Sequence, residues 1–182
     1  MALLKTPLCA FGWPAPDFAL PDPDGKVFRR DSVRGENGLL VVFMCNHCPY
    51  VRAIADRLVS DAKALQCAGV GVVAIMANDV NDYAEDRPEK MKAYAQEWGL
   101  TFPYLYDQSQ DVARAYGAVC TPDFFGFDTG LRLQYRGRID NAPMNPAEAI
   151  ERELLNAMLN VAETGKGPEQ QTPSMGCSIK WR

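Results

Sequence analysis

Two of the six cysteines stand in the segment Cys45-Asn46-His47-Cys48, with two residues between them. Thiolates act as nucleophiles, and this spacing brings two sulfurs close enough to form a disulfide across a short loop. His47 is the single histidine of the chain, and a protonated imidazole next to a thiolate would stabilise it and make the disulfide more oxidising. We therefore predict a redox-active dithiol with Cys45, Cys48 and His47 as catalytic residues and with no metal or other cofactor.

The residues on both sides of this motif predict how it is positioned. Residues 39–44 form an unbroken apolar run of the length of a strand that is buried on both faces. Pro49 then opens a helical pattern that Gly69 ends. Thiols at the start of a helix face free backbone N–H groups and the positive end of the helix dipole. This position lowers a thiol pKa from about 8.5 into a range of roughly 3.5 to 7.5.

The rest of the chain alternates strand and helix patterns. Residues 13–30 contain the turn Asp22-Pro23-Asp24-Gly25 and predict an N-terminal hairpin. Residues 70–77 predict a strand parallel to the run before the motif. The same patterns predict helices over 88–98 and 109–116, a strand over 102–106, and a hairpin of strands 124–127 and 131–136.

The end of the chain predicts one more helix and a tail. Asn145, Pro146 and Glu148 have the pattern of a helix start, and the helix is expected to run to about Ala162. Gly, Pro, Ser and Gln are frequent after it. We expect one α/β domain over residues 1–163, followed by a mobile tail over 164–182 with one anchoring end.

Composition narrows the classes of partner. The chain has 182 residues and a formal net charge of −4, and its basic residues are scattered among acidic ones. We therefore expect neither a nucleic-acid nor a membrane partner. The N-terminus lacks the pattern of a secretion signal, which predicts a cytoplasmic protein. In a compartment that keeps thiols reduced, six cysteines favour catalysis or metal binding over structural disulfides.

Metal binding is an alternative of another class, because two cysteines at this spacing are also half of a metal site. A closed zinc site would have to recruit His47, Cys120 or Cys177, which we regard as the less favoured interpretation. A soft, thiolate-rich site for Cu(I) or an iron-sulfur cluster, formed by Cys45, Cys48 and Cys120, is the stronger metal alternative.

Several separated segments carry a family resemblance. They are Ala15-Pro16-Asp17-Phe18-Ala19-Leu20-Pro21 with Asp24-Gly25-Lys26, Cys45-Asn46-His47-Cys48-Pro49-Tyr50-Val51, Asn78-Asp79, Thr121-Pro122, Tyr135-Arg136-Gly137-Arg138-Ile139-Asp140 and Gly176-Cys177-Ser178-Ile179-Lys180-Trp181. With these segments the chain resembles the thioredoxin-like superfamily and, more closely, its AhpC/TSA redoxin branch, the peroxiredoxin-like group with a CxxC motif. The resemblance implies a thioredoxin-like α/β fold, with a central mixed sheet flanked by helices, an N-terminal β-hairpin extension and a C-terminal tail.

The resemblance also implies a thiol-disulfide oxidoreductase in which Cys45 is the exposed attacking thiol and Cys48 resolves the mixed disulfide. Thioredoxins carry a buried acid in the strand before the motif, whereas residues 39–44 contain no ionisable group. Asp79 is a candidate substitute, although an ordinary turn residue is the favoured interpretation. With His47 beside the motif and without the buried acid, we expect a dithiol of intermediate potential.

Peroxide reduction is the second enzymatic reading of the resemblance. Aligned to peroxiredoxins, Cys48 takes the place of the peroxidatic cysteine and Cys45 that of a threonine. Val41 stands where the peroxiredoxin motif begins with proline, so that motif is broken.

Residues farther along the chain complete the predicted site. Thr121-Pro122 resembles the cis-proline of the fold, and a cis-Pro122 would present the backbone of Thr121 to an extended substrate. Cys120 and Cys177 are candidates for an additional redox thiol. The expected partners are a protein or small-molecule disulfide, or a peroxide, and a dithiol reductant such as a thioredoxin system.

Overall fold

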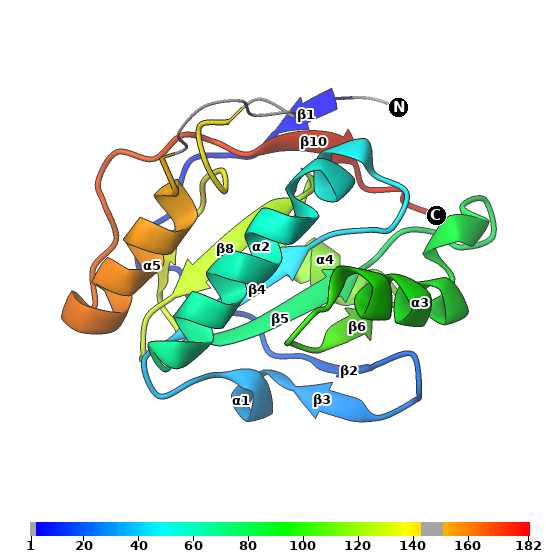
Figure 1. The fold of residues 1–182 in the computed structure, drawn as a ribbon, viewed down its shortest axis with the longest axis horizontal. Coiled ribbons are helices and arrows are strands. Elements are labelled where there is room, and N and C mark those ends of the chain that lie inside the picture. Colours follow the sequence, from blue (N-terminus) through cyan, green and yellow to red (C-terminus); the bar gives the residue numbers. More distant parts are fainter. Residues whose placement is uncertain (1–2, 143–150) are drawn as a thin grey trace.

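A mixed five-stranded sheet forms the centre of the protein in a computed structural model that describes residues 3–142 and 151–182 (Figure 1). Its strands are β4 (Leu39–Phe43), β5 (Gly71–Met76), β6 (Tyr104–Tyr106), β8 (Asp123–Phe127) and β9 (Leu133–Tyr135). They lie in the order β6-β5-β4-β8-β9. β4, β5 and β6 are parallel to one another, while β8 is antiparallel to β4 and β9 is antiparallel to β8. The prediction of a central mixed sheet is confirmed.

Helices cover both faces of this sheet. α2 (Pro49–Cys67), α3 (Pro88–Trp98) and α5 (Glu153–Thr164) share one apolar core with Leu40 and Val42 of β4. Leu39, Val41 and Phe43 of the same strand point to the opposite core. That second core includes residues of α4 (Asp111–Tyr116), of the hairpin β2 (Ala19–Pro21) and β3 (Val27–Arg29), and of α1 (Arg30–Val33). Because β4 is buried on both faces, its carboxyl end is held rigidly.

The helix that follows the motif begins and ends where the sequence predicts. Cys48 is the N-cap of α2 and Pro49 its first residue, where a missing N–H costs nothing. Gly69 has a φ of 77°, a left-handed conformation that glycine adopts without a Cβ clash. The buried residues of α2 follow a helical period and pack on β4 and β5. The two cysteines therefore stand between a buried strand and a helix N-terminus.

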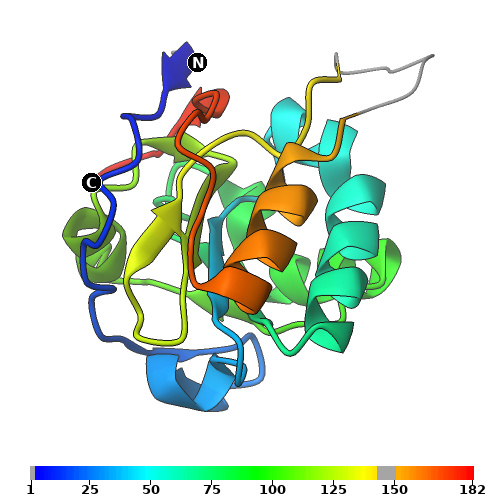
Figure 2. The same cartoon turned by 90° about the vertical axis from the view of Figure 1, so that its left-hand side faces the viewer.

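The segment expected to be a mobile tail carries a strand of a second sheet. β10 (Met175–Ser178) lies between β1 (Leu3–Lys5) and β7 (Cys120–Thr121), and both pairings are antiparallel. Figures 1 and 2 show β1 and β10 side by side at one end of the molecule. A Cβ on Gly176 would stand 2.0 Å from the Thr121 carbonyl oxygen, so only glycine permits this approach. Within the segment expected to be a mobile tail with one anchoring end, residues 175–178 are therefore held by strand pairing on both sides.

Most other boundaries agree with the predictions to within a few residues. The predicted start of the last helix lies outside the described residues, and α5 begins at Glu153. β9 is shorter than predicted because Leu131 has a φ of 57° and belongs to the preceding turn. The remaining element, η1 (Ala84–Asp86), is a short 3-10 helix that the sequence analysis does not predict. Among the described residues, none of the helices has the length and apolarity needed to cross a bilayer.

Candidate functional site

Cys45 and Cys48 lie against the loop that contains the Thr121–Pro122 peptide bond. This bond is cis, as predicted. The Thr121 hydroxyl oxygen is 3.4 Å from the Cys45 sulfur, and the protonated Cys48 thiol donates to the Thr121 carbonyl oxygen at 3.1 Å. Both cysteines are buried, with exposed fractions of 1% and 0%. The prediction of an exposed Cys45 is therefore wrong, because the loop that carries it is held inward.

The structure shifts the pKa values of the two thiols in opposite directions. A hydrogen bond from Cys45 is the largest cause that lowers the pKa of Cys48, while burial opposes it; the Thr121 side chain and the Val51 backbone N–H also lower it. The same thiol-thiol bond, together with burial and the negative charge of Asp86, raises the pKa of Cys45 well above its ordinary value. Cys48 at the helix N-cap is therefore the more acidic thiol of the pair, and Cys45 is the weaker acid.

Asp86 at the end of η1 is a buried acid beside the motif, and the sequence analysis missed it. Its carboxylate accepts the backbone N–H groups of Asn46 at 2.8 Å and His47 at 3.3 Å. It also accepts the Asn78 side-chain amide at 2.8 Å. Burial would raise the pKa of Asp86, but the hydrogen bonds from His47 and Asn78 outweigh it, so that the pKa is lowered. Asp86 is thus a buried carboxylate that fixes the conformation of the motif.

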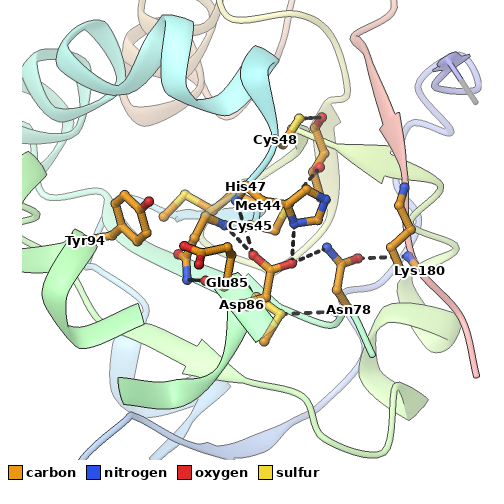
Figure 3. A network of polar contacts seen from close by, with 12 residues as sticks. Met44, Cys45, His47, Cys48, Asn78, Glu85, Asp86, Tyr94 and Lys180 are labelled. Carbon is orange, nitrogen blue, oxygen red and sulfur yellow. Dashed lines mark hydrogen bonds and ion pairs between the residues drawn. The ribbon is translucent and has the colours of Figure 1, made fainter. Parts of the chain in front are cut away.

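His47 is bound to Asp86 and does not stand free beside a thiolate. Its Nδ1 is 2.6 Å from Asp86 Oδ2, and its ring stacks on Tyr83 with 5.1 Å between centroids. Figure 3 shows Asp86 between His47 and Asn78, with Asn78 in turn contacting Lys180. The other ring nitrogen, Nε2, is buried and has no hydrogen-bond partner among the described residues.

Asp79, the candidate base of the sequence analysis, does not fill this role. Its side chain pairs with Arg182 at 3.4 Å and caps its own turn through Asn81. The sequence feature that could have identified Asp86 as a site residue is its position relative to the predicted elements. It lies between the strand next to β4 and the helix that Pro88 starts, and the carboxyl ends of parallel strands meet at one edge of the sheet.

The two candidate additional thiols have different surroundings. Cys177 on β10 pairs in register with Thr121, and its thiol interacts with that of Cys48. The Cys120 thiol instead donates to the Pro122 carbonyl oxygen at 3.6 Å, and burial raises its pKa well above the ordinary value. Cys177 therefore belongs to the dithiol cluster, whereas Cys120 has the surroundings of a structural, protonated thiol.

The metal alternative finds no matching arrangement in the described part of the chain. The grouping of ligand types found there is Cys45, His47 and Asp86, whose ligand atoms lie within 4.8 Å of one another. Cys120 is not part of it. The 2.6 Å separation of His47 and Asp86 is a hydrogen-bond distance, and Asp86 already accepts several N–H groups. His47 and Asp86 thus bond to each other, while the Cys45 sulfur contacts the Thr121 hydroxyl group.

A cavity of about 310 Å³ lies next to the dithiol. It is lined by the cis proline, by the first turns of α2 and by β10, including Pro122, Tyr50, Ile54 and Met175. Two arginines also line the cavity: Arg57 pairs with Asp140, and Arg138 pairs with Glu153. The cavity is thus mixed in polarity and adjoins the predicted substrate residues.

Comparison with known proteins identifies the family. The sequence model of the AhpC/TSA family matches residues 11–136, and the chain belongs to this family. Peroxiredoxin Bcp of Escherichia coli K12 is 29% identical over 112 residues, which are 62% of this chain and 67% of that protein. The thiol-disulfide oxidoreductase ResA of Geobacillus thermodenitrificans is 29% identical over 125 residues, 69% of this chain and 67% of the other.

Solved structures agree with this result. A conserved, uncharacterized protein of Geobacillus kaustophilus has a TM-score of 0.93 at 43% identity, covering 100% of this chain and 97% of the other. A secreted Mycobacterium tuberculosis disulfide oxidoreductase homologous to E. coli DsbE shares the fold, with a TM-score of 0.59 at 19% identity over 79% of this chain and 95% of the other. The fold is thioredoxin-like, and the protein is a redox enzyme of the thiol-disulfide oxidoreductase or peroxiredoxin-like type.

Proposed function

We propose that the protein reduces disulfides with Cys48 as the attacking thiolate and Cys45 as the resolving thiol. The observation that carries this order is the position of Cys48 at the N-cap of α2, where a helix N-terminus stabilises a thiolate, whereas Cys45 is buried beside Asp86. In agreement with it, the pKa of Cys48 is lowered and that of Cys45 is raised. The order is the reverse of the one expected from the resemblance to thioredoxins. It agrees with the peroxiredoxin alignment, in which Cys48 takes the place of the reactive cysteine.

The proposed reaction has two steps. The Cys48 thiolate attacks one sulfur of a substrate disulfide, forms a mixed disulfide and releases the first substrate thiolate. Cys45 then loses its proton and attacks the Cys48 sulfur, which forms the Cys45–Cys48 disulfide and releases the second substrate thiolate. The two released thiolates each take up a proton. A dithiol reductant, such as a thioredoxin system, returns the enzyme to the dithiol state by the reverse exchange.

The cis-proline loop and the neighbouring cavity support a substrate site there. Thr121 touches both sulfurs, and Pro122 lines the cavity. Because Cys48 is 0% exposed, a substrate reaches it only after a movement of the groups that cover it. Protein or small-molecule disulfides are the proposed substrates, and the expected cytoplasmic location stays a prediction.

Peroxide reduction is the second candidate, favoured by the acidity of Cys48. Here the Cys48 thiolate attacks the peroxide, becomes a sulfenic acid and releases water or an alcohol. Cys45 or Cys177 then forms a disulfide with Cys48 and releases water.

Cysteine variants test the proposal and separate the two candidates. Cys48→Ser is expected to abolish dithiol-dependent disulfide reduction, whereas Cys45→Ser/Cys177→Ser is expected to trap a mixed disulfide on Cys48 that mass spectrometry detects. Cys67→Ser, at the exposed end of α2, is the matched control and should keep full activity. Unchanged disulfide reduction by Cys48→Ser would show the assignment to be wrong. Peroxide consumption supported by a dithiol would favour the second candidate.

A further inference from the structure

The resolving thiol needs a base. Cys45 is the weaker acid of the pair, because its hydrogen bond with Cys48, its burial and the charge of Asp86 all raise its pKa. The thiolate is the nucleophile in thiol-disulfide exchange, so a protonated Cys45 resolves the mixed disulfide slowly. The strand before the motif offers no ionisable group.

Asp86 and His47 have the geometry of a base and the residue that orients it. Asp86 Oδ2 lies 2.6 Å from His47 Nδ1, so Nδ1 is the ring nitrogen that the carboxylate orients, and Nε2, which has no partner among the described residues, is the ring nitrogen left for proton transfer. Nε2 is buried without a hydrogen-bond partner among the described residues, although buried polar atoms are normally satisfied. Cys45 Sγ, a ring nitrogen of His47 and a carboxylate oxygen of Asp86 all lie within 4.8 Å of one another.

Asp86 is itself held in place from several sides. The Asn78 amide donates to it at 2.8 Å, and the Asn78 carbonyl accepts the backbone N–H of Lys180 at 2.8 Å (Figure 3). Tyr83 stacks on the imidazole ring and limits its rotation. The orientation of His47 is therefore fixed before substrate arrives, as proton transfer in a single geometry requires.

We propose that His47 is the general base for Cys45 in the resolution step and that Asp86 is its positioning residue. This inference rests on the proposed function. The Cys45 proton moves to His47 Nε2, and the Cys45 sulfur bonds to the Cys48 sulfur. The bond from Cys48 to the substrate sulfur breaks, and the departing thiolate takes the proton from His47. The enzyme loses two electrons, and the substrate disulfide gains them.

A bis(nitroaryl) disulfide separates the two steps in a single turnover. The first nitroaryl thiolate is released when Cys48 is modified, and the second when Cys45 resolves the adduct. The experiment uses a Cys9→Ser/Cys67→Ser/Cys177→Ser background, because the first two thiols are at least partly exposed and the third lies beside Cys48 and could also resolve the adduct. His47→Gln is expected to leave the first release unchanged and to slow the second by about 10²-fold. Asp86→Asn, which keeps the shape but removes the charge, should also slow only the second release.

Asp107→Asn is the matched control. Asp107 is likewise buried, but its carboxylate caps α4 through Ala113, and that variant should release both thiolates at the parent rates. Circular dichroism checks that each variant is folded. The inference is overturned if His47→Gln resolves the adduct at the parent rate, or if both steps slow equally. If the parent protein itself forms no adduct on Cys48, the proposed function fails instead.

Discussion

At the scale of single residues, the different surroundings of the two thiols decide the roles of the two cysteines. The thiol that donates stabilises the charge on the one that accepts, and the donor becomes the weaker acid. The N-terminus of α2 and the Val51 N–H stabilise a thiolate at Cys48, whereas the negative charge of Asp86 destabilises one at Cys45. The chemistry of this site therefore follows from its hydrogen bonds more than from the spacing of the motif.

Removal of the Cys45 thiol, which donates a hydrogen bond to Cys48, is expected to raise the pKa of Cys48. A hydrogen bond to a charged group contributes about 1.5–3 kcal/mol, and one pKa unit corresponds to about 1.4 kcal/mol. In Cys45→Ala the pKa of Cys48 should thus rise by about one to two units. The ultraviolet absorbance of the thiolate, measured against pH with and without Cys48, gives the midpoint. Cys120→Ala is the control and should not change the midpoint. Identical midpoints in Cys45→Ala and in the parent protein would contradict the assignment of Cys45 as the hydrogen-bond donor.

At the scale of elements, a buried ion pair supports the loop that touches both thiols. Asp123 begins β8 directly after Pro122, and its carboxylate binds Arg136 at 3.0 Å. The same arginine donates to the Gly117 carbonyl oxygen at 2.8 Å and lies over the Phe125 ring. Asp123 is 0% exposed, so its charge depends on this partner.

Loss of the arginine should destabilise the protein strongly. Arg136→Met leaves the Asp123 carboxylate buried without its partner, which costs about 3–5 kcal/mol. Unfolding in urea measures the change in the free energy of unfolding. Arg132→Met, on the exposed turn before β9, is expected to change it by no more than about 0.5 kcal/mol. A similar small change in both variants would show that the ion pair does not support the fold.

At the scale of the whole molecule, the C-terminal segment is part of the redox site. β10 occupies the edge of β7 at Thr121, the edge that the sequence analysis reserved for an extended substrate. It brings Cys177 to Cys48, and its continuation joins the Asp86 network where Lys180 donates to Asn78. Cys48 thus lies between two thiols, one on its own loop and one more than a hundred residues later in the chain.

This arrangement predicts a second disulfide when the first is blocked. In Cys45→Ser, a stoichiometric disulfide probe should modify Cys48, and Cys177 should then displace the probe and form a Cys48–Cys177 bond. Peptide mapping by mass spectrometry identifies the bond. Cys45→Ser/Cys177→Ser should retain the probe on Cys48. A bond from Cys48 to Cys120 would contradict the geometry, because the Cys120 thiol points to the Pro122 carbonyl.

The sequence by itself determined the dithiol, the strand and helix that carry it, and the order of most elements. These features depend on local patterns, namely an apolar run, a proline at a helix start and glycines after helix ends. It also indicated the cis-proline loop through its resemblance to the family. Only the tertiary structure decided that Asp86 binds His47, that Cys48 and not Cys45 is the more acidic thiol, and that β10 covers the site. The first and the last depend on contacts between residues about forty or more positions apart, and the second depends on burial and hydrogen bonding around the two thiols; none of these leaves a local pattern in the sequence.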